Sequence, residues 1–133
     1  MSYKRLWFLF EFGLPTAACS LWYVPFMPET ERATQLKQIL QQDPTNTFAR
    51  YALGMEYSSA GEVDAAVGEF RTLVEHSPDY ANAYFMAAQA LARVPDRTAD
   101  VMHWLEDGIA AARRSGNRHA ESEMQQMLDE LAI

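Results

Sequence analysis

The sequence predicts an all-α protein built from repeated pairs of antiparallel helices. Two turns that contain proline, Asp43-Pro44 and Ser77-Pro78, each follow an apolar helical stretch. Between these turns, apolar side chains recur at the three- and four-residue spacing of one helix face. The shift that superimposes the two prolines also aligns similar side chains, which indicates a repeated unit: Ala49 with Ala83, Tyr51 with Phe85, and Leu36 with Phe70.

The first complete unit spans about residues 47–80 and contains two helices. A break at residues 58–61 separates them, because Gly61 suits the left-handed conformation that ends a helix. A polar side chain just before each first helix is expected to cap it. The candidates are Thr45 or Asn46 for the helix of this unit, and Asp79 for the helix that follows Pro78.

A second unit spans about residues 81–116 with a looser pattern. Val94-Pro95-Asp96 replaces the glycine turn, and the second helix keeps its apolar spacing if one residue is inserted. Single helices are predicted on either side, over residues 29–42 and 118–131, as the polar end caps that a repeat array needs. Their inward side chains are expected to be Ala33, Leu36, Ile39 and Leu40 in the first, and Met124, Met127, Leu128 and Leu131 in the last. About six helices in antiparallel pairs result.

One spacing in the first unit carries family information. Arg50-x2-Leu53-Gly54-x2-Tyr57, followed by Ala66-x3-Phe70 and Pro78, resembles the W-x2-L-G-x2-Y, A-x3-F and P pattern of the tetratricopeptide-repeat (TPR) family. Only the leading aromatic residue is replaced, by Arg50. Gly54 and Ala66 are small where paired helices are expected to cross closely. The resemblance covers residues 47–116, and residues 29–131 in outline.

The resemblance implies a function in binding other proteins. In TPR arrays the first helix of each pair lines a concave groove in which peptides or helices dock. The groove of this chain is therefore expected to be lined by Phe48, Tyr51, Met55 and Ser58 from the first unit, and by Asn82, Phe85, Gln89 and Arg93 from the second. Aromatic and methionine side chains with a polar rim are typical of an interface. A helix or a short apolar segment is the expected ligand.

Three alternatives for this face stay open or are disfavoured. Some family members hold a peptide's terminal carboxylate with Lys and Asn side chains, but this chain has Tyr51, Met55, Phe85 and Gln89 at those places, so that mode is not expected. The aromatic side chains alternatively pack against the helix over residues 29–42 or against the segment that precedes Met27. A third alternative is a homodimer that forms through the groove.

Residues 1–26 differ from the rest of the chain. They hold half of the aromatic residues and a net charge of +1, so the total of −7 leaves −8 for residues 27–133. We therefore divide the chain into an atypical segment, residues 1–26, and a helical domain, residues 27–133.

The atypical segment has several interpretations. Lys4-Arg5 before an apolar run resembles a secretory signal, and Cys19 lies where a lipoprotein signal is cleaved, although Glu11 and Pro15 interrupt the run. A membrane anchor, an extension upstream of a start at Met27, and an element packed on the repeats are the other interpretations. The expected location is cytoplasmic, and the alternative is an exported or membrane-tethered assembly factor.

Composition and motifs argue against catalysis, metal binding and nucleic-acid binding. The pI near 4.8 disfavours phosphate backbones, which need clustered Lys and Arg. A single cysteine excludes an internal disulfide and a thiolate cluster. No phosphate-binding loop, dinucleotide fingerprint or Gly-x-Ser-x-Gly motif occurs, and the histidines lack the spacing of a helical zinc site: His76, His103 and His119. We expect a protein-interaction scaffold without enzyme activity, cofactor or metal.

Overall fold

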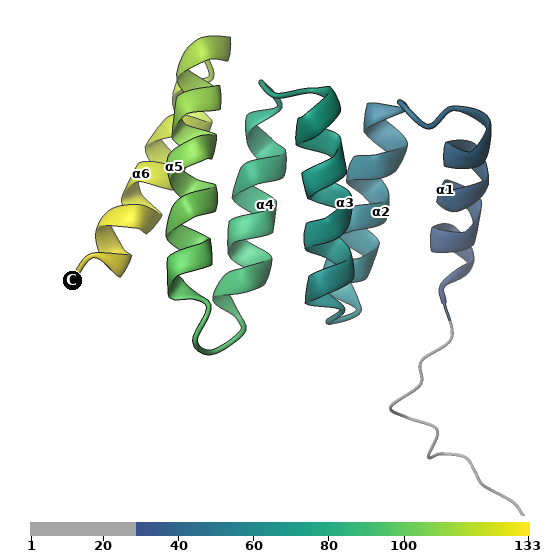
Figure 1. The fold of residues 1–133 in the computed structure, drawn as a ribbon, viewed down its shortest axis with the longest axis horizontal. Helices are drawn as coiled ribbons and strands as arrows, with labels where there is room; N and C mark the ends of the chain where they lie inside the picture. Colours follow the sequence, from purple (N-terminus) through teal and green to yellow (C-terminus); the bar gives the residue numbers. More distant parts are fainter. Residues whose placement is uncertain (1–28) are drawn as a thin grey trace, which may run out of the picture.

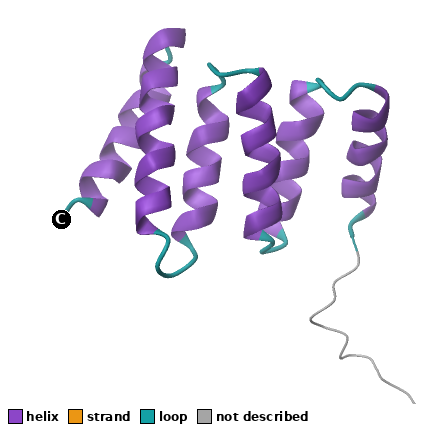
Figure 2. Ribbon diagram, in the orientation of Figure 1, coloured by secondary structure: helices purple, strands orange, loops and turns teal. Residues whose placement is uncertain are grey.

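The computed structural model describes residues 29–133, which form six α-helices joined by short turns (Figure 1). The helices are α1 Glu31–Gln42, α2 Thr47–Ser59, α3 Val63–His76, α4 Ala81–Ala92, α5 Thr98–Ser115 and α6 Arg118–Leu131. Consecutive helices run antiparallel, and all regular secondary structure in this range is helical (Figure 2). The predicted all-α repeat and its six helices are confirmed. The interpretations of residues 1–26, and of Cys19 within them, lie outside the described residues.

The helices form two layers, and neighbouring helices within one layer lie closer to one another than those within the other. α2 packs against α3 and α4 against α5, while α1 flanks α2 and α6 flanks α5. α4 also lies close to both α2 and α6, whereas the backbone of α3 approaches neither that of α1 nor that of α5. Since the helices of one layer are closer together, the array curves toward α2, α4 and α6. We call these three helices the inner layer and α1, α3 and α5 the outer layer.

Two glycines allow close crossings between the layers. A Cβ atom built on Gly54 of α2 would lie 2.7 Å from Cε1 of the fully buried Phe70 in α3. One built on Gly108 of α5 would lie 2.6 Å from Cβ of Tyr84 in α4 and 2.5 Å from Sδ of Met124 in α6. These distances are too short for a real Cβ, so the helices pack this closely only because glycine has no side chain.

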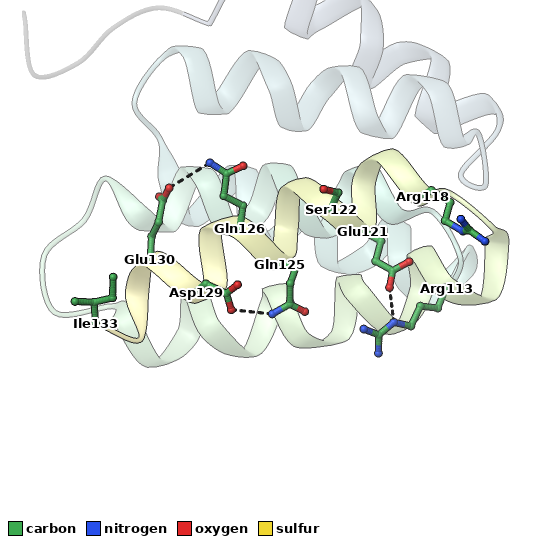
Figure 3. A pocket seen from close by; sticks show the side chains of 9 residues that line it. All are labelled: Arg113, Arg118, Glu121, Ser122, Gln125, Gln126, Asp129, Glu130 and Ile133. Carbon is green, nitrogen blue, oxygen red and sulfur yellow. Dashed lines mark hydrogen bonds and ion pairs between the residues drawn. The ribbon is translucent and has the colours of Figure 1, made fainter.

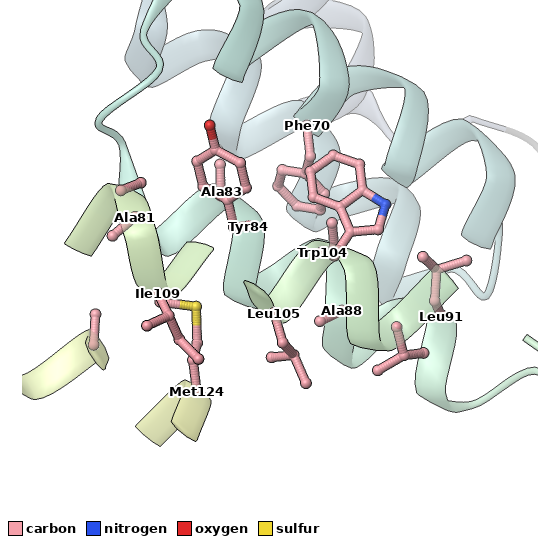
Figure 4. Close-up of a cluster of buried hydrophobic side chains, with 14 of the residues drawn as sticks. Phe70, Ala81, Ala83, Tyr84, Ala88, Leu91, Trp104, Leu105, Ile109 and Met124 are labelled. Carbon is pink, nitrogen blue, oxygen red and sulfur yellow. The ribbon is translucent and has the colours of Figure 1, made fainter. Parts of the chain in front are cut away.

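The main core lies among α3, α4, α5 and α6 (Figure 4). Tyr84 of α4 packs edge-on against Trp104 with ring centroids 5.8 Å apart, and its hydroxyl donates to the Pro78 carbonyl at 2.9 Å. A smaller cluster joins α1 to α2. The largest fully buried side chains are Phe70, Leu73, Leu91, Val101, Leu105 and Met124.

Arg50, which stands where the family pattern has an aromatic residue, has a polar role in this chain. Its Nη1 lies 2.8 Å from Oε1 of Glu69 on α3, and its Nη2 donates to the Pro44 carbonyl at 2.9 Å. Both members of the ion pair are largely shielded from solvent. The guanidinium therefore ties α2 to α3 and to the preceding turn, where a large ring would otherwise fill the space.

The turn between α4 and α5 accommodates the predicted insertion. Asp96 has a φ of +64°, close to the +82° of Gly61 in the first unit. Aspartate is one of the few residues that tolerate this left-handed conformation. The interval from Val63, which begins α3, to Thr98, which begins α5, is one residue longer than the interval between the starts of α2 and α4. The prediction of one inserted residue is confirmed.

The helix caps agree with the sequence in one case and differ in another. Asn46 caps α2, because its Oδ1 accepts from the Ala49 amide at 2.8 Å. The prediction that Asp79 caps α4 is wrong: Tyr80 precedes that helix without a side-chain cap. The Asp79 carboxylate instead accepts from Nε of Arg114 on α5 at 2.7 Å.

One predicted core residue is also placed differently. Ile39 was expected to face inward, yet it is 44% exposed. The reason is that α1 packs against α2 alone among the described helices, so three side chains suffice for its buried stripe: Ala33, Leu36 and Leu40. At the other end, α6 has the predicted bounds, and its Met124 is fully buried.

Candidate protein-binding groove

The two predicted rows of groove residues lie on the inner layer, one on α2 and one on α4. Within each row the residues are three or four positions apart, so they share one helix face. On α2, Phe48 is 69% exposed in the first turn, while Tyr51 and Met55 are half-buried against the core. The row therefore combines a free aromatic ring with two anchored side chains.

Tyr51 is held by neighbouring rings. Its ring centroid lies 5.9 Å from that of Phe70 and 5.4 Å from that of Tyr80, which precedes α4. Burial raises the pKa of the Tyr51 hydroxyl, and the nearby Tyr80 adds to that effect. Tyr51 is therefore neutral at physiological pH and presents a rigid, partly apolar surface.

Ser58 and Arg93, the last residues of the two rows, bind each other. Nη2 of Arg93 donates to Oγ of Ser58 at 2.6 Å and to its backbone carbonyl at 3.2 Å. Ser58 is buried, whereas part of Arg93 remains exposed at the end of α4. This contact joins α2 to α4 and satisfies a carbonyl at the end of α2.

The α4 row continues onto α6. Phe85 is half-buried, and Asn82 and Gln89 are exposed. Phe85 and Gln89 line an open hollow of about 380 Å³ between α4 and α6. The remaining lining residues are Ala92 from α4 and Glu123, Gln126, Met127 and Glu130 from α6. Phe85 and Met127 pack against the core and form an apolar floor.

The rim of this hollow is acidic. Glu123 and Glu130 lie on its α6 side, and no Lys or Arg of the described residues lines it. Within residues 29–133, the partner of Glu123 is His119, with Nε2 and Oε2 2.5 Å apart, and Glu130 accepts from Nε2 of Gln126 at 3.4 Å. Neither carboxylate pairs with a permanent cation in that range.

The α6 side of the candidate groove was not predicted, because α6 was interpreted as an end cap. α5 has 18 residues whereas α3 has 14, so α6 begins later after α4 than α4 begins after α2. A shift by a constant repeat length along the sequence therefore does not align α6 with α2 and α4. The signal that points to α6 is the pair Gln89 and Gln126, whose separation equals that between the first residues of α4 and α6.

A larger hollow of about 610 Å³ lies on the far side of α6, where its outer face meets the end of α5 (Figure 3). Apart from Ile133, the residues that line it are polar or charged, and several of them bind one another; two of them, Gln126 and Glu130, also line the hollow between α4 and α6. Gln125 donates to Asp129 at 2.9 Å, and Arg113 lies 2.6 Å from Glu121. This surface is a polar cap on the array, as expected for a terminal helix.

Other kinds of site find little support in residues 29–133. No group of three or more His, Cys, Asp and Glu side chains in this range is placed to hold a metal ion. No helix in this range has the length and apolar character needed to cross a membrane. The three histidines have local partners on their own helices: the Thr72 carbonyl for His76, Asp107 for His103 and Glu123 for His119.

Comparison with known proteins identifies the family. No family model matches the chain. A TPR repeat-containing protein of Pseudomonas aeruginosa is 29% identical over 96 residues, which cover 72% of this chain and 90% of that protein. A tetratricopeptide repeat domain protein from Salinibacter ruber, of known structure, is 34% identical, with a TM-score of 0.61, over 67% of this chain and 89% of that one.

The chain belongs to the tetratricopeptide-repeat family. A second solved structure, a complex of the TPR2B domain of yeast Sti1 with pHsp70, has a TM-score of 0.68 over 75% of this TPR protein and 79% of that chain. At 14% identity this likeness shows the shared fold alone. Within this TPR protein, α2 packs against α3 and α4 against α5, and α1 and α6 flank these two pairs.

Proposed function

We propose that this TPR protein is a protein-interaction scaffold that binds a helix or a short apolar segment of another protein along its inner layer. The observation that carries the proposal is the set of accessible apolar side chains that the three helices of that layer present. Phe48, Tyr51 and Met55 on α2 are followed by Phe85 on α4 and Met127 on α6.

The energetics of this row favour binding. Tyr51 and Phe85 are already held by packing, so a ligand that covers them gains apolar contact at little cost in side-chain entropy. Phe48 projects into solvent and loses more exposed apolar surface when it is covered. Exposed Asn82 and Gln89 beside these rings supply the polar rim that fixes a ligand's position.

The fold supports the same function, and the side chains limit its mode. The yeast TPR2B domain with this fold was solved with pHsp70, so the architecture is suited to holding another protein. The Lys and Asn clamp for a terminal carboxylate is absent from the positions of Tyr51, Met55, Phe85 and Gln89. An internal segment, recognised by its apolar side chains, fits better than a free chain terminus.

The proposal is tested by affinity capture with the tagged full chain from cells that naturally produce it. The test variant is Phe48→Glu, which places a charge on the exposed ring position of the inner layer. The matched control is Ile39→Glu, at an exposed apolar position on the outer layer. Loss of a partner with Phe48→Glu, and its retention with Ile39→Glu, is the expected result.

Two other results contradict the proposal. Equal capture by both variants places the binding surface elsewhere. A homodimer in light scattering that Phe48→Glu dissociates makes self-association the role of the inner layer. Circular dichroism of each variant checks that the helices persist.

A further inference from the structure

We infer that the bound segment is basic as well as apolar: an apolar side chain enters the hollow between α4 and α6 while Lys or Arg side chains meet Glu123 and Glu130. This inference rests on the proposed function and names the chemistry of its partner. It concerns the α4–α6 part of the inner layer, where the surface changes from aromatic to acidic.

The hollow between α4 and α6 is shaped to receive one apolar side chain of a bound segment. Phe85 and Met127 form its apolar floor, and it opens widely to solvent with a volume of about 380 Å³. Met127 is flexible and adapts to different apolar side chains. A leucine, methionine or aromatic residue of a partner is the natural occupant of such a floor.

The separation of the two carboxylates matches two basic side chains on a partner helix, and it is too large for both to hold one ion. Glu123 and Glu130 are two helical turns apart on α6, which is about 10 Å along the helix axis. A single metal ion or small cation does not bridge that distance. Two basic side chains about two turns apart on a partner helix match it, with the apolar residue between them.

The charge arrangement in α6 is unfavourable without a partner. Asp129 and Glu130 lie in the last turn of α6, where the helix dipole disfavours negative charge, and no basic residue in that turn offsets them. Arg93, the cation at the end of the neighbouring α4, is bound to Ser58. A cationic ligand therefore relieves a repulsion that exists in the free protein, which favours its binding.

The test uses two synthetic helical peptides of about four turns with the same leucine stripe. One carries Lys at two positions that flank this stripe, two helical turns apart, and the other carries Glu at the same positions. Fluorescence anisotropy with the full-length protein measures the affinity of each. The Lys peptide is expected to bind, with an affinity that falls as salt rises, and the Glu peptide is expected not to bind.

Since the whole protein is acidic, a matched pair of charge reversals separates the hollow from the net charge. Glu123→Lys with Glu130→Lys is expected to weaken binding of the Lys peptide roughly tenfold or more, because two attractions become repulsions. Glu75→Lys with Glu106→Lys changes the net charge equally at exposed positions on α3 and α5. That control is expected to weaken binding less than about threefold.

Four outcomes overturn the inference. Equal loss of affinity in both double variants assigns the attraction to net charge. Failure of the Lys peptide to bind, or equal binding of both peptides, removes the basic partner. If binding is equal for both peptides but is lost with Phe48→Glu, the proposed scaffold function stands and only the charge preference fails. A dimer that the Glu123→Lys and Glu130→Lys changes dissociate makes a second copy the occupant instead.

Discussion

The ring of Phe70 occupies the space that any side chain at Gly54 would need. A Cβ there would lie 2.7 Å from Cε1 of Phe70 and 2.8 Å from its Cζ. Phe70 is fully buried, and its ring also supports Tyr51 of the inner layer. The crossing of α2 and α3 therefore determines the position of a candidate binding residue.

Gly54→Ala is expected to lower the free energy of unfolding by about 1–3 kcal/mol, because the buried ring must move to admit the methyl group. Gly68→Ala on α3 is the matched control, since a Cβ built on Gly68 has no atom within 4 Å apart from its chain neighbours and the backbone of its own helix. There the better helix propensity of alanine is expected to raise stability by about 0.5–1 kcal/mol. Urea unfolding followed by circular dichroism measures both. A stabilising effect at Gly54 would show that Phe70 yields without cost.

The contact between Arg93 and Ser58 is expected to stabilise the junction of the two repeats. A double-mutant cycle with Arg93→Ala and Ser58→Ala should give a coupling energy of about 0.5–1.5 kcal/mol, reduced from that of a buried charged bond because Arg93 is partly exposed. Urea unfolding of the wild type, both single variants and the double variant supplies the four values. Additive effects of the two changes would mean that the bond contributes nothing in solution.

Stability is expected to fall in alkaline solution partly through two tyrosines. Burial raises the pKa of both Tyr51 and Tyr84. Below the unfolded-state pKa of about 10, both states keep the proton and full stability is present. As the pH rises further toward the folded-state pKa, the unfolded chain releases a proton that the folded protein retains, so the free energy of unfolding decreases.

Tyr51→Phe isolates this effect. The hydrogen bond to Glu29 raises the pKa of Lys37, which adds a loss of stability in the same direction, and the variant leaves this contribution unchanged. Unfolding measured at several pH values above about 9 is expected to show a shallower decline for Tyr51→Phe than for the wild type. Identical declines would place the Tyr51 hydroxyl in contact with water.

Glu130→Lys is expected to stabilise the free protein. The change places a cation in the last turn of α6, where the helix dipole favours it by about 0.3–1 kcal/mol at low salt. Thermal unfolding at low and high salt measures the gain, which should shrink as salt rises. A loss of stability would indicate that the bond from Gln126 outweighs the dipole. The same change is expected to weaken the binding of a basic ligand. Glu130 therefore lowers the stability of the free protein while it favours binding.

Much of the fold follows from residues that act locally. The proline turns, Gly61 and the small side chains of Gly54 and Ala66 each restrict the backbone or the helix spacing directly, so their places were predictable. Asp79 and Ile39 were predicted wrongly for a different reason. Asp79 binds Arg114, and Ile39 lies on a helix that packs against one described neighbour, so both depend on which helices meet.

The candidate groove was predictable on α2 and α4 and not on α6. The first three residues of each row share the repeat interval that the two proline turns display directly in the sequence. The acidic rim depends on the longer α5, which shifts α6 along the chain, and on packing that brings Met127 beside Phe85. The bond from Arg93 to Ser58 joins side chains on two different helices and has no signature in either helix alone.

The unequal lengths of α3 and α5 have a consequence for protein engineering. The junction between α3 and α4 keeps the regular repeat interval, whereas the one between α5 and α6 does not. A consensus TPR unit of about 34 residues inserted before Ala81 therefore continues the existing superhelix and leaves both terminal helices in place. The same unit inserted before Arg118 is followed by α6, which does not keep the regular repeat interval. The α3–α4 junction is the place at which the binding surface is modular, and a longer ligand is accommodated by lengthening the array there.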